Sequence, residues 1–231
     1  MPRHNLTLFG KVQGVRTTAA TDWAELLLPD RIDGGLRQAP DALLVYQRLR
    51  WTPAEPGDLR CRAGVAWERP HGAEVERGLW ADAAIGDTVV ADAALVVRHP
   101  GRAETLGTPA LPESPAAPST IVDDQLVVTE DEVRAFVARA GSAYSATTTM
   151  TAAHRRGFAG LLVPGTLLLL AGAGRAARES RGSVEAWFRG PVPAGAVLTR
   201  HRSDDGDTEA FFLAGRARAS VVLRREASKL S

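Results

Sequence analysis

The chain has 231 residues, of which 45% are hydrophobic and 24% are charged, and its net charge is +1. This balance is typical of one large globular domain or two small ones, and the lack of a basic excess argues against a nucleic-acid partner. The single cysteine, Cys61, excludes an internal disulfide and a cysteine-bound zinc. The longest apolar run, Leu161 to Ala173, is shorter than the roughly 20 residues that span a bilayer. We therefore expect a cytoplasmic protein that does not enter membranes.

The first half of the sequence is dominated by segments rich in β-forming residues. They predict five strands, at Leu6–Phe9, Leu43–Trp51, Leu59–Trp67, Glu76–Ala81 and Thr88–Arg98. After Pro29 the chain reads DRIDGG, which cannot continue a long helix. The first half therefore predicts a sheet whose helical part is eroded.

A segment rich in proline, glycine, alanine and serine, Pro100 to Pro118, follows these strands and has no hydrophobic periodicity. Such a composition is typical of a linker. The sequence thus predicts two domains, 1–99 and 120–231, joined by a linker at 100–119.

The second half has clearer local signals. A strand is predicted at Gln125–Val128, followed by a helix over Glu130–Ala140 whose capping box pairs Thr129 with Glu132. A second, almost wholly apolar helix is predicted over Leu167–Ala177, and we expect it to be buried. Four further strands are predicted at Ser183–Arg189, Ala196–Arg202, Glu209–Ala217 and Ala219–Arg225. The acidic cluster Asp204–Asp207 is interpreted as a hairpin turn between two of them.

The two halves share three short patterns in the same order. Residues 23–29 (WAELLLP) match 158–164 (FAGLLVP), residues 53–57 (PAEPG) match 191–195 (PVPAG), and residues 94–98 (ALVVR) match 220–224 (SVVLR). Each match is short, but their common order and similar spacing favour an internal duplication.

The segment Gly141 to Leu167 carries the strongest functional signal. A hydroxyl-rich loop precedes Gly157-Phe158, and Val163-Pro164-Gly165 then opens the apolar helix. This resembles the MaoC-like hydratase/dehydratase branch of the hotdog fold, in which the loop reads roughly G-D-x-N-P-x-H and a G-F…(V)-H-G turn opens the central helix. The resemblance implies an α+β double hotdog, in which two antiparallel sheets wrap a central helix and the N-terminal repeat is eroded.

The acid and base of that family are replaced in this sequence. Aligned without a gap, Ser142 stands at the position of the catalytic Asp, Thr147 at that of the catalytic His and Tyr144 at that of the Asn. Serine and threonine hydroxyls are not usable bases near neutral pH, whereas the Tyr144 phenol can donate to a carbonyl or enolate. The candidate catalytic residues are therefore Tyr144, Thr147 and Ser142. The alternatives are that Tyr144 is a core residue with a satisfied hydroxyl and that Thr147–Thr151 is a plain strand or loop.

The resemblance also implies substrate-binding residues. In the family, the amide of the turn glycine polarises the thioester carbonyl, and Gly165 keeps that amide, while Pro164 stands in place of the His. The remaining candidates are residues of the same segment and one acidic residue of the first half: Thr149, Phe158, His154 and Asp22. We expect His154 on a small surface helix. The five histidines are dispersed without metal-ligand spacing, so neither a metal nor a cofactor is expected.

The resulting hypothesis is an enzyme of hydratase/dehydratase ancestry that acts on an acyl thioester or a polyketide-like substrate. Without the Asp/His dyad it would be a repurposed lyase, isomerase or cyclase of bacterial secondary metabolism. The alternative is a non-catalytic acyl-binding partner subunit of a heteromeric dehydratase. A hotdog thioesterase, with Asp22 or Glu25 activating water, is a third possibility. The acyl group would be free or carried by coenzyme A or an acyl carrier protein, and the protein would be a monomer, a homodimer or part of a heterodimer.

Overall fold

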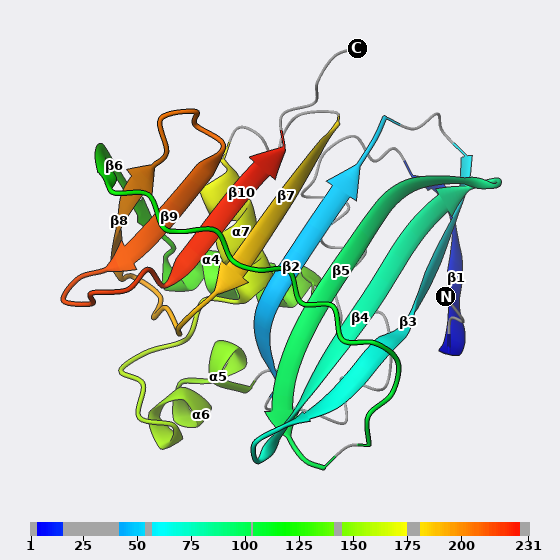
Figure 1. The fold of residues 1–231 in the computed structure, drawn as a ribbon, viewed down its shortest axis with the longest axis horizontal. Coiled ribbons are helices and arrows are strands. Elements are labelled where there is room, and N and C mark those ends of the chain that lie inside the picture. The colour runs from blue at the N-terminus through cyan, green and yellow to red at the C-terminus, as the bar shows by residue number, and fades with distance from the viewer. Residues whose placement is uncertain are drawn as a thin grey trace.

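The computed structural model describes residues 4–15, 42–53, 57–102, 104–140, 145–174 and 181–226. Ten antiparallel strands form one sheet, and the helices lie on one side of it (Figure 1). The strands of the first half are β1 (His4–Val15), β2 (Leu43–Trp51), β3 (Gly57–His71), β4 (Glu74–Ile85) and β5 (Thr88–Pro100). Those of the second half are β6 (Thr120–Val127), β7 (Gly182–Phe188), β8 (Val197–Arg202), β9 (Thr208–Leu213) and β10 (Val221–Glu226).

The strand order is β1-β3-β4-β5-β2-β7-β10-β9-β8-β6. Outward from the centre of the sheet, the strands of the first half are β2, β5, β4, β3 and β1, and those of the second half are β7, β10, β9, β8 and β6. In each half these are the second, fifth, fourth, third and first strands along the chain. The halves join where β2 pairs with β7, from Tyr46 opposite Trp187 to Trp51 opposite Gly182, and we call this junction the seam. At its end a Cβ on Gly182 would lie 2.7 Å from the Trp51 ring, so only glycine fits there.

Four helices are described: α4 (Glu130–Ala140), α5 (Ser145–Thr148), α6 (Met150–Arg155) and α7 (Gly165–Ala173). The predicted capping box at the start of α4 is confirmed: the backbone N–H of Thr129 donates to Glu132 Oε2 at 2.7 Å, and the Glu132 N–H donates to Thr129 Oγ1 at 3.2 Å. The apolar α7 is buried as expected, and Leu168 and Leu169 share one core with strands of both halves. It ends at Ala173 rather than Ala177, because Gly174 adopts a positive φ of 55° and ends the helix.

The interpretation of Thr147–Thr151 as a strand or loop is wrong, because this segment forms α5 and α6. Thr149 between them is extended, with φ −136° and ψ 137°, and its side chain accepts a hydrogen bond from the Ala152 N–H. It is therefore the N-cap of α6. The predicted strand at Glu209–Ala217 is also too long, since β9 ends at Leu213 and Gly215 turns with φ 77°.

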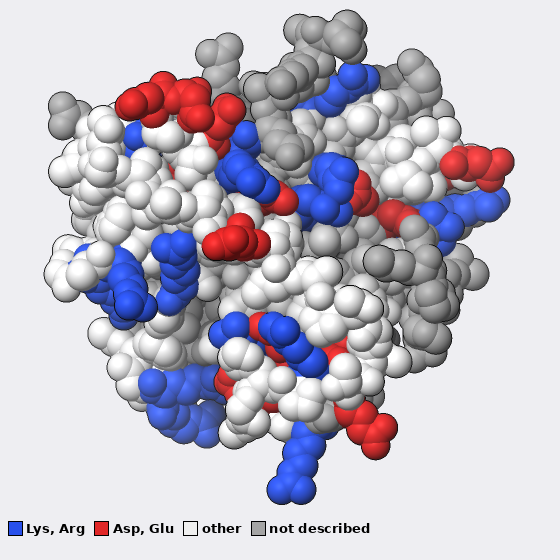
Figure 2. All heavy atoms as spheres, viewed as in Figure 1, with Lys and Arg blue, Asp and Glu red and all other residues white. Residues whose placement is uncertain are grey.

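The sheet has a helix-facing side and an outer side. On the outer side, residues 104–119, which we call the linker after its predicted role, cross the strands (Figure 1). Trp187 Nε1 donates to Pro112 O at 3.0 Å, and Arg189 donates to Pro115 O at 3.2 Å, so the linker is fixed across the seam. Positive and negative side chains are interspersed on this face rather than gathered in one patch (Figure 2).

The hairpin turn predicted at Asp204–Asp207 is confirmed. It joins β8 and β9, with the Ser203 N–H donating to Thr208 O at 2.9 Å and Gly206 at φ 77°. In the ranges that the structure describes, no helix is both long and apolar enough to cross a membrane.

Candidate functional site

The chain that leads into α7 is held by backbone hydrogen bonds on both sides. The Leu162 N–H donates to Ala146 O of α5 at 3.0 Å, and the Val163 N–H donates to Val192 O, between β7 and β8, at 2.9 Å. The beginning of the central helix is therefore fixed relative to both the sheet and the short helices.

The N-terminus of α7 leaves backbone donors without helical partners. Pro164 is the N-cap and has no side-chain capping bond, and the first hydrogen bond of the helix runs from the Leu168 N–H to Pro164 O. The backbone N–H groups of residues 165–167 therefore have no acceptor within the helix. A Cβ on Gly165 would lie 2.8 Å from Leu44 Cδ2 and 3.2 Å from the Phe188 ring, so the helix begins in close contact with the seam.

Two buried polar side chains meet at this helix start. The Thr166 hydroxyl donates to Gln47 Oε1 at 2.8 Å, and the two residues are only 3% and 1% exposed. Within the described part of the chain, Gln47 Nε2 is buried and has no hydrogen-bond partner. A buried amide nitrogen without a partner is costly, so Nε2 is an unsatisfied donor on a side chain that contacts the first turn of α7. Sequence reasoning missed this pair; the signal was a glutamine on the otherwise apolar helix-facing side of β2, two residues before Leu49.

The structure describes five of the eight residues that the sequence proposed for the site. Gly165 starts α7, and Thr147 is buried in α5 at 3% exposure. Phe158 is partly buried against Ala146, Ala153 and Leu162.

Thr149 and His154 lie further out. Thr149 is exposed and caps α6, and His154 is exposed on that helix as expected, with Nε2 3.2 Å from Ala159 O. Ser142, Tyr144 and Asp22 lie outside the described residues.

The described residues at the start of α7 include no usable base. The buried carboxylates of the described chain all pair with arginine: Glu76, Asp82, Glu185 and Glu209. Burial would raise the pKa of Glu76, but hydrogen bonds from Arg98 and Arg69 hold that pKa below its ordinary value. These carboxylates are committed to ion pairs. The arrangement at α7 can bind and polarise a carbonyl, but the described residues there cannot remove a proton.

Structural comparison identifies the architecture. HtdX of Mycobacterium tuberculosis superposes with TM-scores of 0.68 and 0.70 in two structures, at 13–14% identity, over 95–96% of this chain and 99% of HtdX. A MaoC-like dehydratase from Phytophthora capsici gives a TM-score of 0.58 at 16% identity, over 82% of this chain and 70% of that protein. Rv0216 of M. tuberculosis, described as a double hotdog, gives 0.53 at 17% identity, over 82% and 75%. This chain is a double hotdog.

The sequence alone does not match any family model, and no curated protein matches it significantly. At these identities the likeness of this double hotdog to MaoC-like dehydratases concerns the fold. The expected double hotdog is thereby confirmed, with the two predicted sheets joined at the seam into one. The eroded helical part that the sequence predicted after Pro29 lies outside the described residues. In the double hotdog, α7 is the central helix of the second half, and its N-terminus lies where β2 of the first half meets β7.

Proposed function

We propose that this double hotdog binds an acyl thioester or a polyketide-like acyl chain with its carbonyl oxygen at the N-terminus of α7. The observation that carries the proposal is the uncapped start of this buried helix beside the Gln47–Thr166 pair. Free N–H groups at a helix start and the helix dipole favour negative charge. A donor placed at a developing oxyanion typically contributes a factor of about 10²–10³ in rate.

The chemistry that suits such a site is polarisation without a strong base. An enolate-like or alkoxide-like transition state would be stabilised by the amides of α7 and by Gln47 Nε2. Orientation of a reactive chain in the site would supply the rest of the acceleration. We therefore propose a lyase, isomerase or cyclase reaction of hydratase/dehydratase ancestry. From the sequence alone, Tyr144 is proposed as the proton donor, with Ser142 and Thr147 as further hydroxyl contacts.

The test is an assay of the purified protein with crotonyl and longer enoyl thioesters, in which loss of the enoyl absorbance reports hydration. Gln47→Met keeps the length of the side chain and removes the amide donor. Gln125→Met makes the same chemical change at an exposed position of β6, beside the C-terminal end of α7 rather than its start, and serves as the control. We expect Gln47→Met to lower kcat/KM by about tenfold or more and the control to leave it unchanged. Tyr144→Phe tests the proposed proton donor in the same assay. Absence of both turnover and acyl binding would contradict the proposal.

A second candidate function is a non-catalytic, acyl-binding partner subunit. In the described ranges every buried carboxylate pairs with an arginine, so no described carboxylate at the start of α7 is free to act as an acid or a base. This arrangement favours the second function. Binding of enoyl thioesters without turnover would support this function, as would activity that appears only after mixing with a dehydratase that has the full motif. The thioesterase hypothesis has less support, because α7 (GTLLLLAGA) carries no carboxylate.

A further inference from the structure

A cavity lies at the C-terminal end of α7. It has a volume of about 490 Å³ and is bounded by β6, β8, β9, β10 and the last turn of the helix. This volume is within the range of small-molecule sites, roughly 300–1,000 Å³. Its apolar wall includes Leu126, Phe211 and Ala171. Its polar wall holds three arginines together with one amide and one carboxylate: Arg200, Arg202, Arg225, Gln125 and Asp124.

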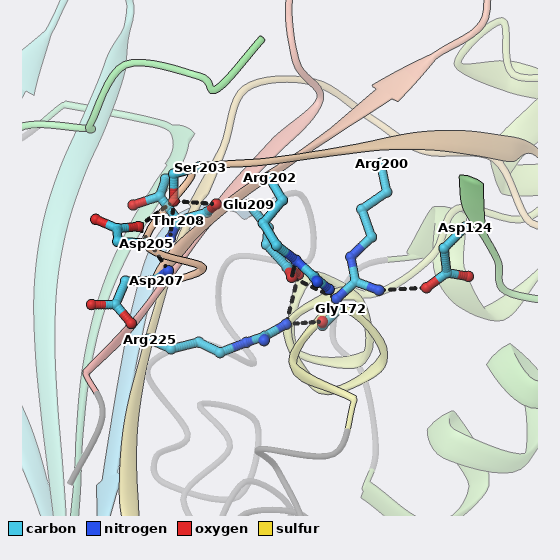
Figure 3. A network of polar contacts seen from close by, with 10 residues as sticks. All are labelled: Asp124, Gly172, Arg200, Arg202, Ser203, Asp205, Asp207, Thr208, Glu209 and Arg225. Atoms are coloured by element: carbon cyan, nitrogen blue, oxygen red, sulfur yellow. Dashed lines mark hydrogen bonds and ion pairs between the residues drawn. The ribbon is translucent and has the colours of Figure 1, made fainter. Parts of the chain in front are cut away.

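The three arginines converge on one buried carboxylate (Figure 3). Glu209 is 0% exposed, and its oxygens accept hydrogen bonds from Arg200 Nη2 at 2.5 Å, Arg202 Nε at 2.9 Å and Arg225 Nη2 at 2.6 Å. Arg225 also donates to Gly172 O of α7 at 3.1 Å, and Arg200 bonds Asp124. The network therefore holds the guanidinium groups in fixed positions at the cavity.

The number of arginines exceeds what the carboxylate needs. On the outer side of the first half, the equally buried Glu76 pairs with two arginines, Arg69 and Arg98. Glu209 has three, and one of them, Arg202, uses only its Nε for that carboxylate. The remaining donors of Arg202 stay on a side chain that lines the cavity, and an anion is the ligand that matches them.

Arg202 is placed to contact that anion. Its side chain is 40% exposed, and within the described residues its hydrogen bond to Glu209 uses Nε alone. Its two terminal nitrogens are then available as a planar pair of donors, which matches a phosphate or carboxylate. For Arg200, burial would lower the pKa, but the hydrogen bond and charge of Glu209 raise it above the ordinary value, so Arg200 stays charged.

We propose that this cavity binds a small organic anion, with an oxyanion head group on Arg202 and a short apolar chain against Phe211, Leu126 and the last turn of α7. The site is separate from the N-terminus of α7, and it does not depend on the function proposed there. The ligand class is an alkyl phosphate or a short fatty carboxylate.

The first experiment is isothermal titration calorimetry of the full chain with hexyl phosphate and hexanoate, compared with hexanol and inorganic phosphate. Hexyl phosphate has no carbonyl group and so does not mimic a thioester. We expect hexyl phosphate or hexanoate to bind about tenfold or more tightly than both hexanol and inorganic phosphate. Whichever of the two anions binds more tightly identifies the preferred head group. Equal binding of hexanol, or no binding of either anion, would overturn the proposal.

Variants then locate the binding. Arg202→Gln should weaken binding by roughly 10- to 100-fold, the value of a lost hydrogen bond between charged groups. Arg69→Gln is the matched control, because Arg69 is 38% exposed and also bonds a fully buried glutamate, but lines no part of this cavity. Unchanged binding in Arg202→Gln, or an equal loss in both variants, would contradict the assignment.

A further pair of variants separates this site from the other end of α7. Ala171→Leu narrows the apolar part of the cavity and should reduce binding of hexyl phosphate more than that of inorganic phosphate. Gln47→Met should not change hexyl phosphate binding, since Gln47 contacts the helix start. Loss of hexyl phosphate binding in Gln47→Met would place the ligand at the wrong end of the helix and overturn the proposal.

Discussion

The two halves of the molecule have the same strand order but differ in where they place buried carboxylates. In the first half, Glu76 and Asp82 alternate with the core residues of β4 and lie on the outer side, paired with arginines. In the second half, Glu185 also lies on the outer side, whereas Glu209 shares the side of Phe211 and faces α7. Within the described residues, only the second half places a buried carboxylate beside the central helix, where its arginines line a cavity.

The seam shows that the halves are not independent. Gln47 of the first half completes the polar contact at the start of α7 in the second. Tyr46, its neighbour on the outer side, donates to Glu185 of β7 at 2.8 Å. One strand therefore contributes to the candidate site from one side and to an ion-pair network from the other.

The largest effect is expected from Gly78→Ala in the first half, measured against Gly172→Ala in the second. A Cβ on Gly78 would lie 2.2 Å from the rigid Trp67 ring, whereas one on Gly172 would meet the end of the Leu223 side chain at 2.3 Å. We expect a loss of about 3 kcal/mol for Gly78→Ala. Gly172→Ala should lose less, because Leu223 can rotate and alanine favours a helix by about 1 kcal/mol. Urea unfolding, with m-values equal to that of the unchanged protein, measures the free energy of unfolding of both variants. An equal loss of free energy in the two would show that the two glycines are packed alike.

Tyr46→Phe tests the connection across the seam. The change removes the hydrogen bond to Glu185 and leaves Arg224 as the partner of that carboxylate. A hydrogen bond to a buried charged group contributes about 1.5–3 kcal/mol, so we expect a loss near 2 kcal/mol. The ring contact with Trp187, at 5.4 Å between centroids, is retained. A loss below about 0.5 kcal/mol would mean that Arg224 alone satisfies Glu185.

Thr129→Ala tests a feature of the second half alone. It removes the N-cap of α4 and should cost about 1 kcal/mol in the free energy of unfolding. Hydrogen exchange should show faster opening of α4 while the strands β3–β5 of the first half keep their protection. Equal loss of protection in both halves would show that α4 unfolds only with the whole molecule.

The smallest effect is expected from Glu132→Gln, and it depends on pH. Hydrogen bonds from the backbone and side chain of Thr129 hold the pKa of Glu132 below its ordinary value of 4.5. The ionised carboxylate therefore stabilises the fold above pH 4.5, and this contribution is lost as the pH falls through the lowered pKa. Unfolding midpoints of the two proteins should differ at pH 7 and converge toward pH 3. A constant difference over that range would contradict the role of the charge.

Much of the framework could be predicted from the sequence, because it depends on local patterns. The capping box of α4, the burial of α7 and the bounds of β2 follow from residues that are close in the chain. One of the three internal matches also falls at equivalent places: residues 94–98 lie in β5, the fifth strand of the first half, and residues 220–224 lie around β10, the fifth strand of the second. The domain boundaries themselves stay a prediction.

The contacts that make the sites could not be predicted in this way. Gln47 and Thr166 are 119 positions apart, and their contact depends on how β2 meets α7. The cluster around Glu209 takes its arginines from β8 and β10, and the sequence pattern there predicted strands and a turn but not the meeting of these side chains. The short α5 was missed because a helix of four residues is not specified by local propensity and forms only in its tertiary context.

The linker has a consequence for assembly. It must connect β5, near the centre of the sheet, with β6 at one edge, a path of roughly 29 Å across six strand spacings. Residues 101–119 could extend roughly 63 Å, and the surplus length lies over the outer side, fixed by Trp187 and Arg189. Sheets that stack face to face lie about 10 Å apart, and the linker occupies that space over the seam. The outer side over the seam is thereby closed to direct back-to-back stacking of two sheets.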